Sequence, residues 1–437
     1  MVRSSVLYTS AQVVGLGLGL ANAIIISRLL GPSGRGIVSL AIVLTGLATT
    51  FATLGFATSF AFFAGKRTYP TAQVVGAMLV SAVTLGGACM LVILVLSAPL
   101  LSTILAGMQW IELLVTAASM PFAFLSLFLL TFLTGAGRAL RAARLQIGAS
   151  VMGTALLAIV LGPAHGGVTG GIVAIAMTSA LVASWYLAVV AREHGIAFSG
   201  CRTVVTAAAR YGLQVYPGSL SGQFWLRADV FVLNLFAGAA AVGQYSLAAS
   251  LAEKVWVLDS SVSQVTLHKV IGASGEEAAR LVAITTRNVL FVAGIGCIAL
   301  ALIAPWFVPL VFGADFAPAV GPLWLLLPGV LAIATARPMS SYFFGQMGRP
   351  AITSGVSIVT AAVAVAAYLA LIPPYGAVGA AAGSSIAYLV PLVAYIPLFR
   401  KFTGVGAREL LLLTRQDVEG YRRMAASVLR LGRKPTA

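Results

Sequence analysis

The chain has 437 residues, of which 60% are hydrophobic and only 9% are charged, and its mean hydropathy is +1.01. This composition excludes a soluble protein and predicts a polytopic membrane protein. The formal net charge of +16 would suggest a nucleic-acid partner in a soluble chain. Here the cations are spread over short loops, so they indicate membrane topology and attraction to anionic lipid headgroups, and a nucleic-acid partner is excluded.

Apolar windows of about 20 residues predict an all-α fold with about twelve transmembrane helices. The first six are expected near residues 6–28, 36–64, 72–97, 110–134, 146–162 and 169–191. The second six are expected near residues 211–236, 243–267, 288–306, 319–343, 352–371 and 377–399. Kinks are expected at Pro217-Gly218 in the seventh span and at Pro338 in the tenth, because proline removes a helical hydrogen bond.

The Lys and Arg residues are distributed unevenly between the two sides of these spans. With the N-terminus inside the cell, 22 of the 27 fall on the cytoplasmic side, and only Arg28 and Arg35 fall outside. Because cytoplasmic loops carry an excess of Lys and Arg, both termini are expected in the cytoplasm of a bacterium, and the spans in its inner membrane. Arg287 is expected close to the inner face and solvated.

A duplication organises the chain. Residues 31–41, which contain Gly31, Gly36 and Ser39, are matched 207 residues later by residues 238–248. Six helices separate the copies, so both enter the membrane in the same direction and form a parallel repeat. We expect two six-helix lobes facing each other across a central cavity. Their residues would be 1–205, which includes a following cytoplasmic loop, and 206–399, before a basic amphipathic cytoplasmic tail at 400–437.

Four charged residues inside the seventh and eighth spans form a quartet: Arg227, Asp229, Glu253 and Lys254. Arg227 lies 11 residues before Gly238, and Glu253 lies 10 residues after Gly243. At a rise of about 1.5 Å per residue, both lie about 15 Å from the outer turn. Two ion pairs can therefore form, Arg227 with Glu253 and Asp229 with Lys254. The pairs would either lock the hairpin or belong to a binding site.

Several short strings, taken in order, resemble the polysaccharide flippases of the multidrug/oligosaccharidyl-lipid/polysaccharide superfamily, which includes MATE-type transporters. The strings are Ser27–Pro32, Arg227–Asp229, Gly243–Ser246 followed by Ala252–Lys254, and Pro374–Ala380. The resemblance covers about the first 400 residues. It implies alternating access that moves an undecaprenyl-pyrophosphate-linked oligosaccharide from the inner to the outer leaflet, for O-antigen, capsule or exopolysaccharide synthesis.

A pyrophosphate and a hydroxyl-rich glycan cannot cross hydrocarbon without cationic partners and hydrogen-bond donors. We therefore expect Arg227, Lys254, Arg337 and Arg28 to contact substrate, and Glu253 or Asp229 to couple the cycle to a proton or sodium ion. Two of these residues have a competing interpretation. Arg28 would instead reach lipid headgroups, and Arg337 would either close an inner gate or reach the cytoplasmic interface.

The positions that match the quartet in the first repeat are Leu20, Asn22, Gly46 and Leu47. The charge is thus one-sided, which disfavours a cation-coupled drug exporter without eliminating it. A scaffold of the glycan synthesis complex is a further alternative, and glycosyltransferases or a polysaccharide polymerase are candidate partners. No nucleophile arrangement, metal-ligand spacing or Gly-Lys-Ser/Thr loop occurs, so the sequence predicts no enzyme, metal or cofactor.

Overall fold

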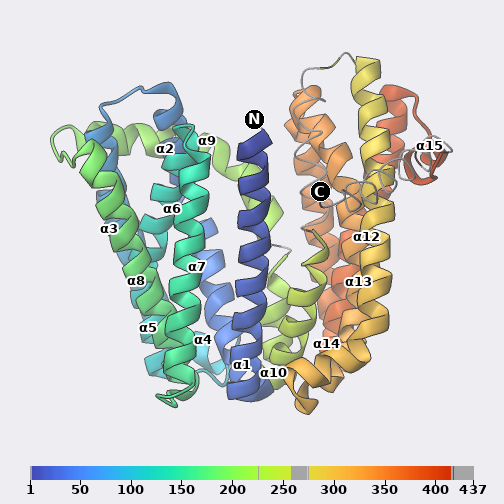
Figure 1. Cartoon of the computed structure of the whole chain (residues 1–437), viewed down its shortest axis with the longest axis horizontal. Helices are drawn as coiled ribbons and strands as arrows, with labels where there is room; N and C mark the ends of the chain where they lie inside the picture. Colours follow the sequence, from blue (N-terminus) through green and yellow to red (C-terminus); the bar gives the residue numbers. More distant parts are fainter. Residues whose placement is uncertain (1, 225, 257–272, 274, 415–416, 418–437) are drawn as a thin grey trace, which may run out of the picture. The chain divides into compact units, whose positions relative to one another are not determined.

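The computed structural model describes residues 2–224, 226–256, 273, 275–414 and 417, and within that part every regular element is helical. In the first half of the chain these are α1 (Val2–Phe51), α2 (Phe56–Lys66), α3 (Thr71–Val95), α4 (Ser97–Ser102), α5 (Trp110–Ala118), α6 (Met120–Gly135), α7 (Ala139–Leu161), α8 (Gly167–His194) and α9 (Cys201–Phe224). The remaining elements are α10 (Ala228–Ala252), α12 (Gly275–Phe312), η1 (Ala314–Ala319), α13 (Val320–Ser341), η2 (Tyr342–Gln346), α14 (Pro350–Thr403) and α15 (Ala407–Leu411), and Figure 1 labels most of them.

Nine helical segments of the described chain are long and apolar enough to cross a membrane. Three long helices contain one glycine with non-helical torsions: Gly31 in α1, Gly238 in α10 and Gly376 in α14. Each glycine falls between two predicted spans, so each of these helices contains the junction of a predicted pair. The prediction of an all-helical, many-span membrane protein is confirmed.

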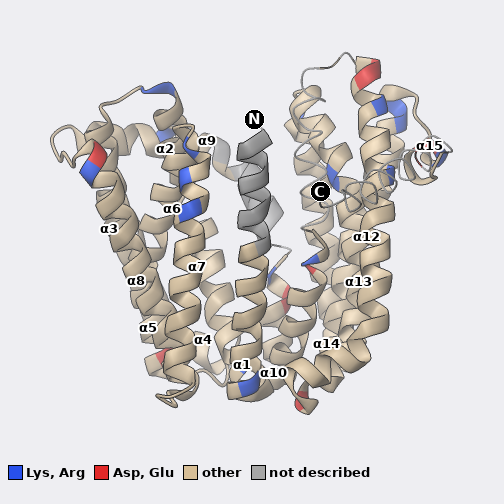
Figure 2. Cartoon of the chain, in the orientation of Figure 1, with Lys and Arg blue, Asp and Glu red and all other residues tan. Residues whose placement is uncertain are grey.

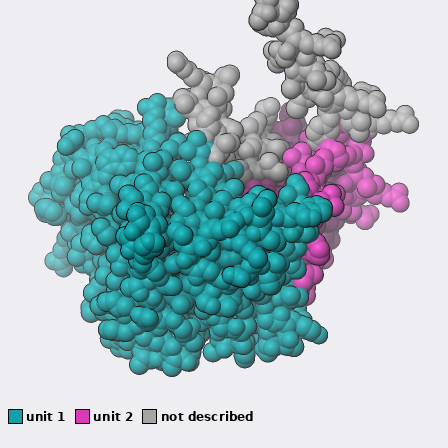
Figure 3. Space-filling model, turned by 60° about the horizontal axis from the view of Figure 1, so that its bottom comes forward, with its two compact units in different colours: residues 1–250, 303–323, 364–384 teal, residues 251–302, 324–363, 385–437 magenta. Residues whose placement is uncertain are grey.

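The described residues pack into two compact units that alternate along the chain (Figure 3). Unit 1 holds residues 1–250, 303–323 and 364–384, and unit 2 holds residues 251–302, 324–363 and 385–437. Both α12 and α14 contribute to each unit. The predicted division into lobes at 1–205 and 206–399 stays a prediction.

Phenylalanine side chains hold α2 against α6 in unit 1. The ring of Phe60 lies edge-on to Phe128, with centroids 5.2 Å apart, and Phe56 lies 5.8 Å from Phe60. All three rings are buried. Edge-to-face aromatic pairs of this kind add to the stabilisation that burial gives.

The two matched turns meet each other inside unit 1. Gly31 has φ 65° and ψ −175°, and Gly238, 207 residues later, has φ 75° and ψ 176°. This conformation is one that glycine adopts readily and other residues avoid. The hydroxyl of Ser39 donates to Ser246 Oγ over 2.9 Å, which joins two equivalent positions.

The backbones of these turns touch in a reciprocal way. A Cβ added to Gly36 would lie 1.8 Å from the carbonyl oxygen of Ala239, and one added to Gly243 would lie 1.9 Å from that of Pro32. Pro32 and Ala239 are themselves matched positions. We call residues 31–39 and 238–246 together the paired turns. Small residues allow such close approach of membrane helices.

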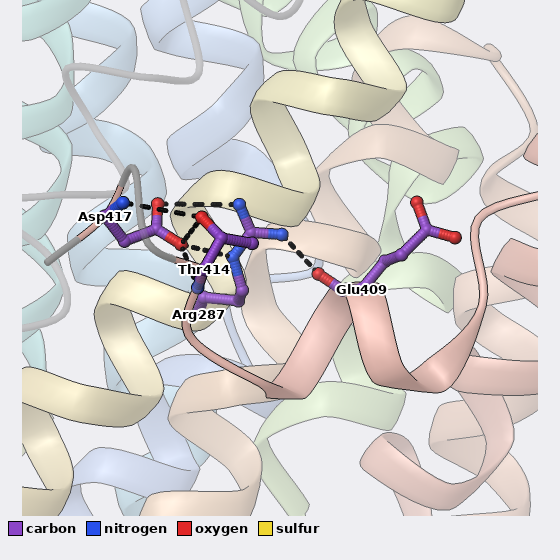
Figure 4. A network of polar contacts seen from close by, with 4 residues as sticks. All are labelled: Arg287, Glu409, Thr414 and Asp417. Atoms are coloured by element: carbon purple, nitrogen blue, oxygen red, sulfur yellow. Dashed lines mark hydrogen bonds and ion pairs between the residues drawn. The ribbon is translucent and has the colours of Figure 1, made fainter.

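Aromatic residues also form the core of unit 2, where Tyr342 packs on Phe399 with centroids 5.1 Å apart. Beside this core, the segment after α15 is tied to α12 by Arg287 (Figure 4). Arg287 is 8% exposed, its Nε donates to Asp417 Oδ2 over 2.9 Å, and its Nη1 donates to the carbonyl of Glu409. The prediction that Arg287 is solvated is therefore wrong, because it neutralises a carboxylate of the tail.

Asp417 responds to this environment. Burial raises its pKa, but hydrogen bonds from Thr414 and Arg287 outweigh burial, so the pKa lies below the ordinary value. The bond between tail and α12 therefore favours the ionised carboxyl. Most of the predicted amphipathic tail, residues 415–416 and 418–437, lies outside the described residues.

Candidate functional site

The charged quartet lies at interruptions of the helices. α9 continues through Pro217 and Gly218 and ends at Phe224, and α10 begins at Ala228. The predicted continuous span at 211–236 is thus broken next to Arg227, which lies in a turn. After α10 ends at Ala252, Glu253 and Lys254 form a second turn. Non-helical backbone at membrane depth is tolerated only where protein buries it or where it lines a wet cavity.

Asp229, in the first turn of α10, is 2% exposed and belongs to a buried polar cluster in unit 1. The Tyr245 hydroxyl donates to its Oδ2, and Ser384 Oγ lies 3.3 Å from the same oxygen and 2.8 Å from the Tyr245 hydroxyl. Tyr368 extends the cluster, with its hydroxyl 3.2 Å from Ser384 Oγ. The cluster thereby connects α10 to the middle of α14.

Glu253 and Lys254 are half-buried, as is Arg227. The boundary between units 1 and 2 falls at Ser250 and Leu251, just before the second turn. Arg227 and Asp229 therefore belong to unit 1, and Glu253 and Lys254 to unit 2. The ion pairs between the two halves of the quartet stay a prediction.

The other two predicted substrate contacts occupy separate places. In unit 2 the Arg337 guanidinium lies 4.7 Å from the ring centre of Trp256, an attractive cation–π arrangement. In unit 1 Arg28 is exposed, and its guanidinium donates to the carbonyls of Leu310 and Val311 near the end of α12. A cation at a helix C-terminus satisfies carbonyls that lack helical partners, so Arg28 makes a structural contact. Its side chain is nevertheless exposed at the surface of the protein.

Sequence reasoning missed Arg35, which was expected outside the membrane. The side chain is 6% exposed, and its Nη1 donates to the carbonyl of Ala23 over 2.9 Å and to Ser27 Oγ over 2.7 Å. Its Nη2 lies 3.4 Å from Ser250 Oγ, while its Nε has no hydrogen-bond partner. Arg35 is buried because the turn at Gly31 folds the second part of α1 back against the first part, which contains Ala23 and Ser27. No local sequence pattern distinguishes Arg35 from a solvated arginine in a loop.

Glu112 was also missed, although it lies at the start of a predicted span. It is 2% exposed, and its side chain accepts a hydrogen bond from the backbone of Gln109 over 2.8 Å and from Thr169 over 3.0 Å. Glu112 therefore caps the first turn of α5 and ties it to α8. The first half of the chain does contain a buried acid, and its role is structural.

Unit 1 also contains a cavity of about 440 Å³ between α1, α6, α7 and α8. We call it the hydroxyl-lined cavity because its polar lining residues are Asn22, Ser126, Gln146, Ser150, Thr178 and Ser179. Apolar side chains such as Ile26, Leu157 and Val182 complete the wall, and among the described residues the lining includes no Lys, Arg, Asp or Glu. Asn22 Oδ1 is buried and has no hydrogen-bond partner.

Within unit 1 most cations lie at one end of the helices. Lys66 and Arg67 end α2, Arg138 precedes α7 and Arg192 lies in the last turn of α8. Figure 2 shows blue residues gathered near that end. Arg138 and Arg141 both pair with Glu193 there. In the described part of the chain no group of three or more His, Cys, Asp or Glu could hold a metal ion.

Repeated hairpins, apolar helices and polar residues enclosed among them define a multi-pass membrane protein. The chain belongs to the family described as polysaccharide biosynthesis protein, whose model matches residues 1–267. The resemblance stated from the sequence strings is thereby confirmed. No curated protein matches the chain.

Solved structures share the fold at low sequence identity. The lipid II flippase MurJ, in an inward closed conformation, is similar with a TM-score of 0.77 at 12% identity, over 99% of this chain and 94% of that one. An inward-facing multidrug resistance MATE transporter of the MOP superfamily gives 0.71 at 19% identity, over 88% and 94%. A MOP superfamily transporter from Pyrococcus furiosus, described by the reverse polarity of its binding pocket, gives 0.63 at 18% identity, over 92% and 94%. These likenesses establish the fold.

Proposed function

We propose that the protein is a flippase that moves an undecaprenyl-pyrophosphate-linked oligosaccharide from the inner to the outer leaflet by alternating access. The glycan would serve O-antigen, capsule or exopolysaccharide synthesis. The family match and the fold shared with a lipid II flippase support this proposal. The polyprenyl tail would stay in lipid while the polar headgroup passes among the helices.

The observation that supports it most is that helices break where the charges are. Arg227 lies in the turn between α9 and α10, and Lys254 lies in the turn after α10. In secondary transporters, discontinuous helices supply substrate and ion sites near the midplane, because their backbone groups are left for ligands. Charges inside membrane spans are costly and usually mark a ligand path.

The proposal gives the charged residues different tasks. Arg227, Lys254 and Arg337 would attract the pyrophosphate, and Arg28 would meet the headgroup at the outer side. Of the two acids predicted for ion coupling, Glu253 is the better candidate for exchanging a proton or sodium ion. Asp229 already accepts hydrogen bonds from buried hydroxyls, which would have to be given up for it to serve.

The site is tested by Arg227→Ala in a strain whose own copy of the gene is deleted. The deletion should make lipid-linked oligosaccharide accumulate on the cytoplasmic face, and the variant should fail to restore surface glycan although it still inserts. Arg202→Ala is the matched control, since Arg202 is exposed in the first turn of α9. Full export by Arg227→Ala would refute the site, and normal surface glycan in the deletion strain would refute the function.

A cation-coupled drug exporter is the second candidate, because Asp229 and Glu253 are acids in or beside a candidate span and MATE transporters share the fold. It predicts dye or drug resistance on overexpression. A scaffold of the glycan synthesis complex, with glycosyltransferases or a polymerase as partners, predicts instead that Arg227→Ala and Glu253→Ala leave surface glycan intact.

We further propose that the spans lie in the bacterial inner membrane with both termini in the cytoplasm. The cations gathered at one end of the unit 1 helices support this orientation. A reporter that is active only outside the cytoplasm, fused after residue 437, should be inactive.

A further inference from the structure

We infer that the hydroxyl-lined cavity of unit 1 receives an uncharged sugar residue of the transported glycan. The inference rests on the proposed flippase function and adds to it where the carbohydrate is held. The proposed function assigns the pyrophosphate to the charged quartet at the helix breaks. It gives no role to the cavity among α1, α6, α7 and α8, whose mainly apolar wall carries six polar side chains.

The hydrogen bonds of the cavity wall leave acceptors facing the space. Each of four hydroxyls donates its proton to the carbonyl four residues earlier in its own helix: Ser126 and Ser150 over 2.9 Å, Thr178 over 2.7 Å and Ser179 over 3.1 Å. A hydroxyl whose proton is used in this way still offers its oxygen lone pairs to a ligand.

Two side-chain amides complement these hydroxyls. Asn22 and Gln146 line the same space, and an amide can donate as well as accept. The ligand that matches several acceptors and a few donors at once is a polyol, since each sugar hydroxyl can do both. The apolar wall formed by Ile26, Leu157 and Val182 suits the C–H faces of a sugar ring.

Charge and size narrow the ligand class. The described lining residues include no Lys, Arg, Asp or Glu that would neutralise a pyrophosphate or an organic cation. The volume of about 440 Å³ lies within the range of about 300–1,000 Å³ that holds small organic ligands. The cavity therefore fits a neutral sugar unit better than either charged alternative.

Asn22 provides independent support. It occupies the position that Asp229 occupies in the second repeat, 207 residues later. Asp229 is enclosed by donors, while Asn22 Oδ1 is buried at the cavity without any hydrogen-bond partner. Buried polar atoms are nearly always paired, so an unmade bond at a residue that lines the cavity supports a ligand contact there, made when the Asn22 side chain turns its amide toward the space.

Binding to the purified full-length protein tests the inference with two probes. One is lipid-linked oligosaccharide extracted from cells in which the gene is deleted, and the other is undecaprenyl pyrophosphate, which lacks the sugar. The unaltered protein should bind the first at least about tenfold more tightly, the equivalent of about 1.4 kcal/mol. Ser150→Phe, which fills the cavity, should bring the two affinities within about threefold of each other.

Two further variants control for misfolding and for effects of substitutions outside the cavity. Thr178→Val keeps the shape and removes one hydroxyl, so it should lower the preference by about two- to tenfold even where Ser150→Phe fails to fold. Ser184→Phe is the matched control, because exposed Ser184 of α8 bonds its own helix at Ala180 over 2.8 Å and does not line the cavity. It should keep the full preference.

The outcomes separate this inference from the proposed function. Equal binding of both probes by the unaltered protein overturns the cavity inference and leaves the flippase function standing. An undiminished preference in both Ser150→Phe and Thr178→Val also overturns it. Failure to bind either probe refutes the flippase function, and the cavity inference falls with it.

Discussion

The hairpin at Gly31 and the hairpin at Gly238 are alike at the turn and different along the helices that leave it. Both glycines adopt nearly the same torsions, and Gly36 and Gly243 pack reciprocally against the opposite turn. Away from the turn, Asn22 faces an uncharged cavity, whereas its counterpart Asp229 is held by Tyr245 and Ser384.

The difference shows which part of the duplicated sequence is architectural. Three matching pairs, Gly31 with Gly238, Gly36 with Gly243 and Ser39 with Ser246, shape the paired turns and make the contacts between them. The repeats differ inside the turns at Arg35 against Val242, and along the helices that leave them at Asn22 against Asp229. Function in this fold is therefore to be sought where the repeats diverge.

The largest effect is expected from a disulfide bond between the paired turns. Ser39→Cys combined with Ser246→Cys, in a chain whose three native cysteines are replaced by alanine, should form a disulfide on oxidation, because the two Oγ atoms lie 2.9 Å apart. Alternating access requires the two repeats to move against each other, so we expect glycan export to stop and a reductant to restore it.

Each single-cysteine variant, treated with the same oxidant, is the control and should export normally. Export at the unaltered rate by the fully oxidised double variant would show that the paired turns stay together throughout the cycle. Alternating access would then have to open elsewhere.

The next largest effect is expected from Gly36→Ala and Gly243→Ala. Their new Cβ atoms would meet backbone oxygens at 1.8 and 1.9 Å, which no side-chain rotation can relieve. Overpacking usually costs about 1–3 kcal/mol, and here we expect the upper end of that range. A lower Tm in detergent and poor accumulation in the membrane would measure it.

Gly46→Ala provides the matched control, because nothing lies within 4 Å of its added Cβ and the residue is exposed in the same helix. The Tm of Gly46→Ala should equal that of the unaltered protein. Equal Tm values for Gly36→Ala and Gly46→Ala would mean that the turns are not closely packed.

Sequence reasoning found the helical class, the duplication and the residues at the helix breaks, because each leaves a local pattern. Hydropathy marks the spans, and glycines at a constant offset mark the turns. The breaks themselves were misplaced. The kink expected at Pro217 would lie inside α9, which continues to Phe224, while the turn at Arg227 carries no proline or glycine.

Side-chain partners far apart in the sequence could not be predicted. Asp229 is bonded by Ser384, 155 residues away, and Arg287 by Asp417, 130 residues away. A positive charge near a loop gives the same sequence pattern whether its side chain is solvated or buried. Arg287 and Arg35 were both expected outside the hydrophobic core, and both side chains are buried. The hydroxyl-lined cavity could not be predicted either, because serine and threonine within helices usually bond their own backbone and so give no sign of a ligand site.

At the matched positions Asn22 and Asp229, which differ between the repeats, Asp229→Ala should lower stability more than Asn22→Ala. It leaves the buried hydroxyls of Tyr245 and Ser384 without their carboxylate acceptor, which costs about 1–3 kcal/mol. Asn22→Ala removes an oxygen with no partner, so its loss of Tm should be smaller. The opposite order would mean that the two positions do not differ as their contacts indicate.

The smallest effect should come from the hydroxyl pair at the centre of the paired turns. Ser39→Ala and Ser246→Ala each remove one neutral hydrogen bond, worth about 0.5–1.5 kcal/mol. Because both substitutions break the same bond, the double variant should cost clearly less than the sum of the singles, and thermal unfolding of all four proteins measures the difference. Ser246 also donates to the carbonyl of Gly243 within its own helix, over 3.1 Å. Fully additive losses would therefore show that each serine bonds only its own helix, and that backbone packing at Gly36 and Gly243 alone joins the two repeats.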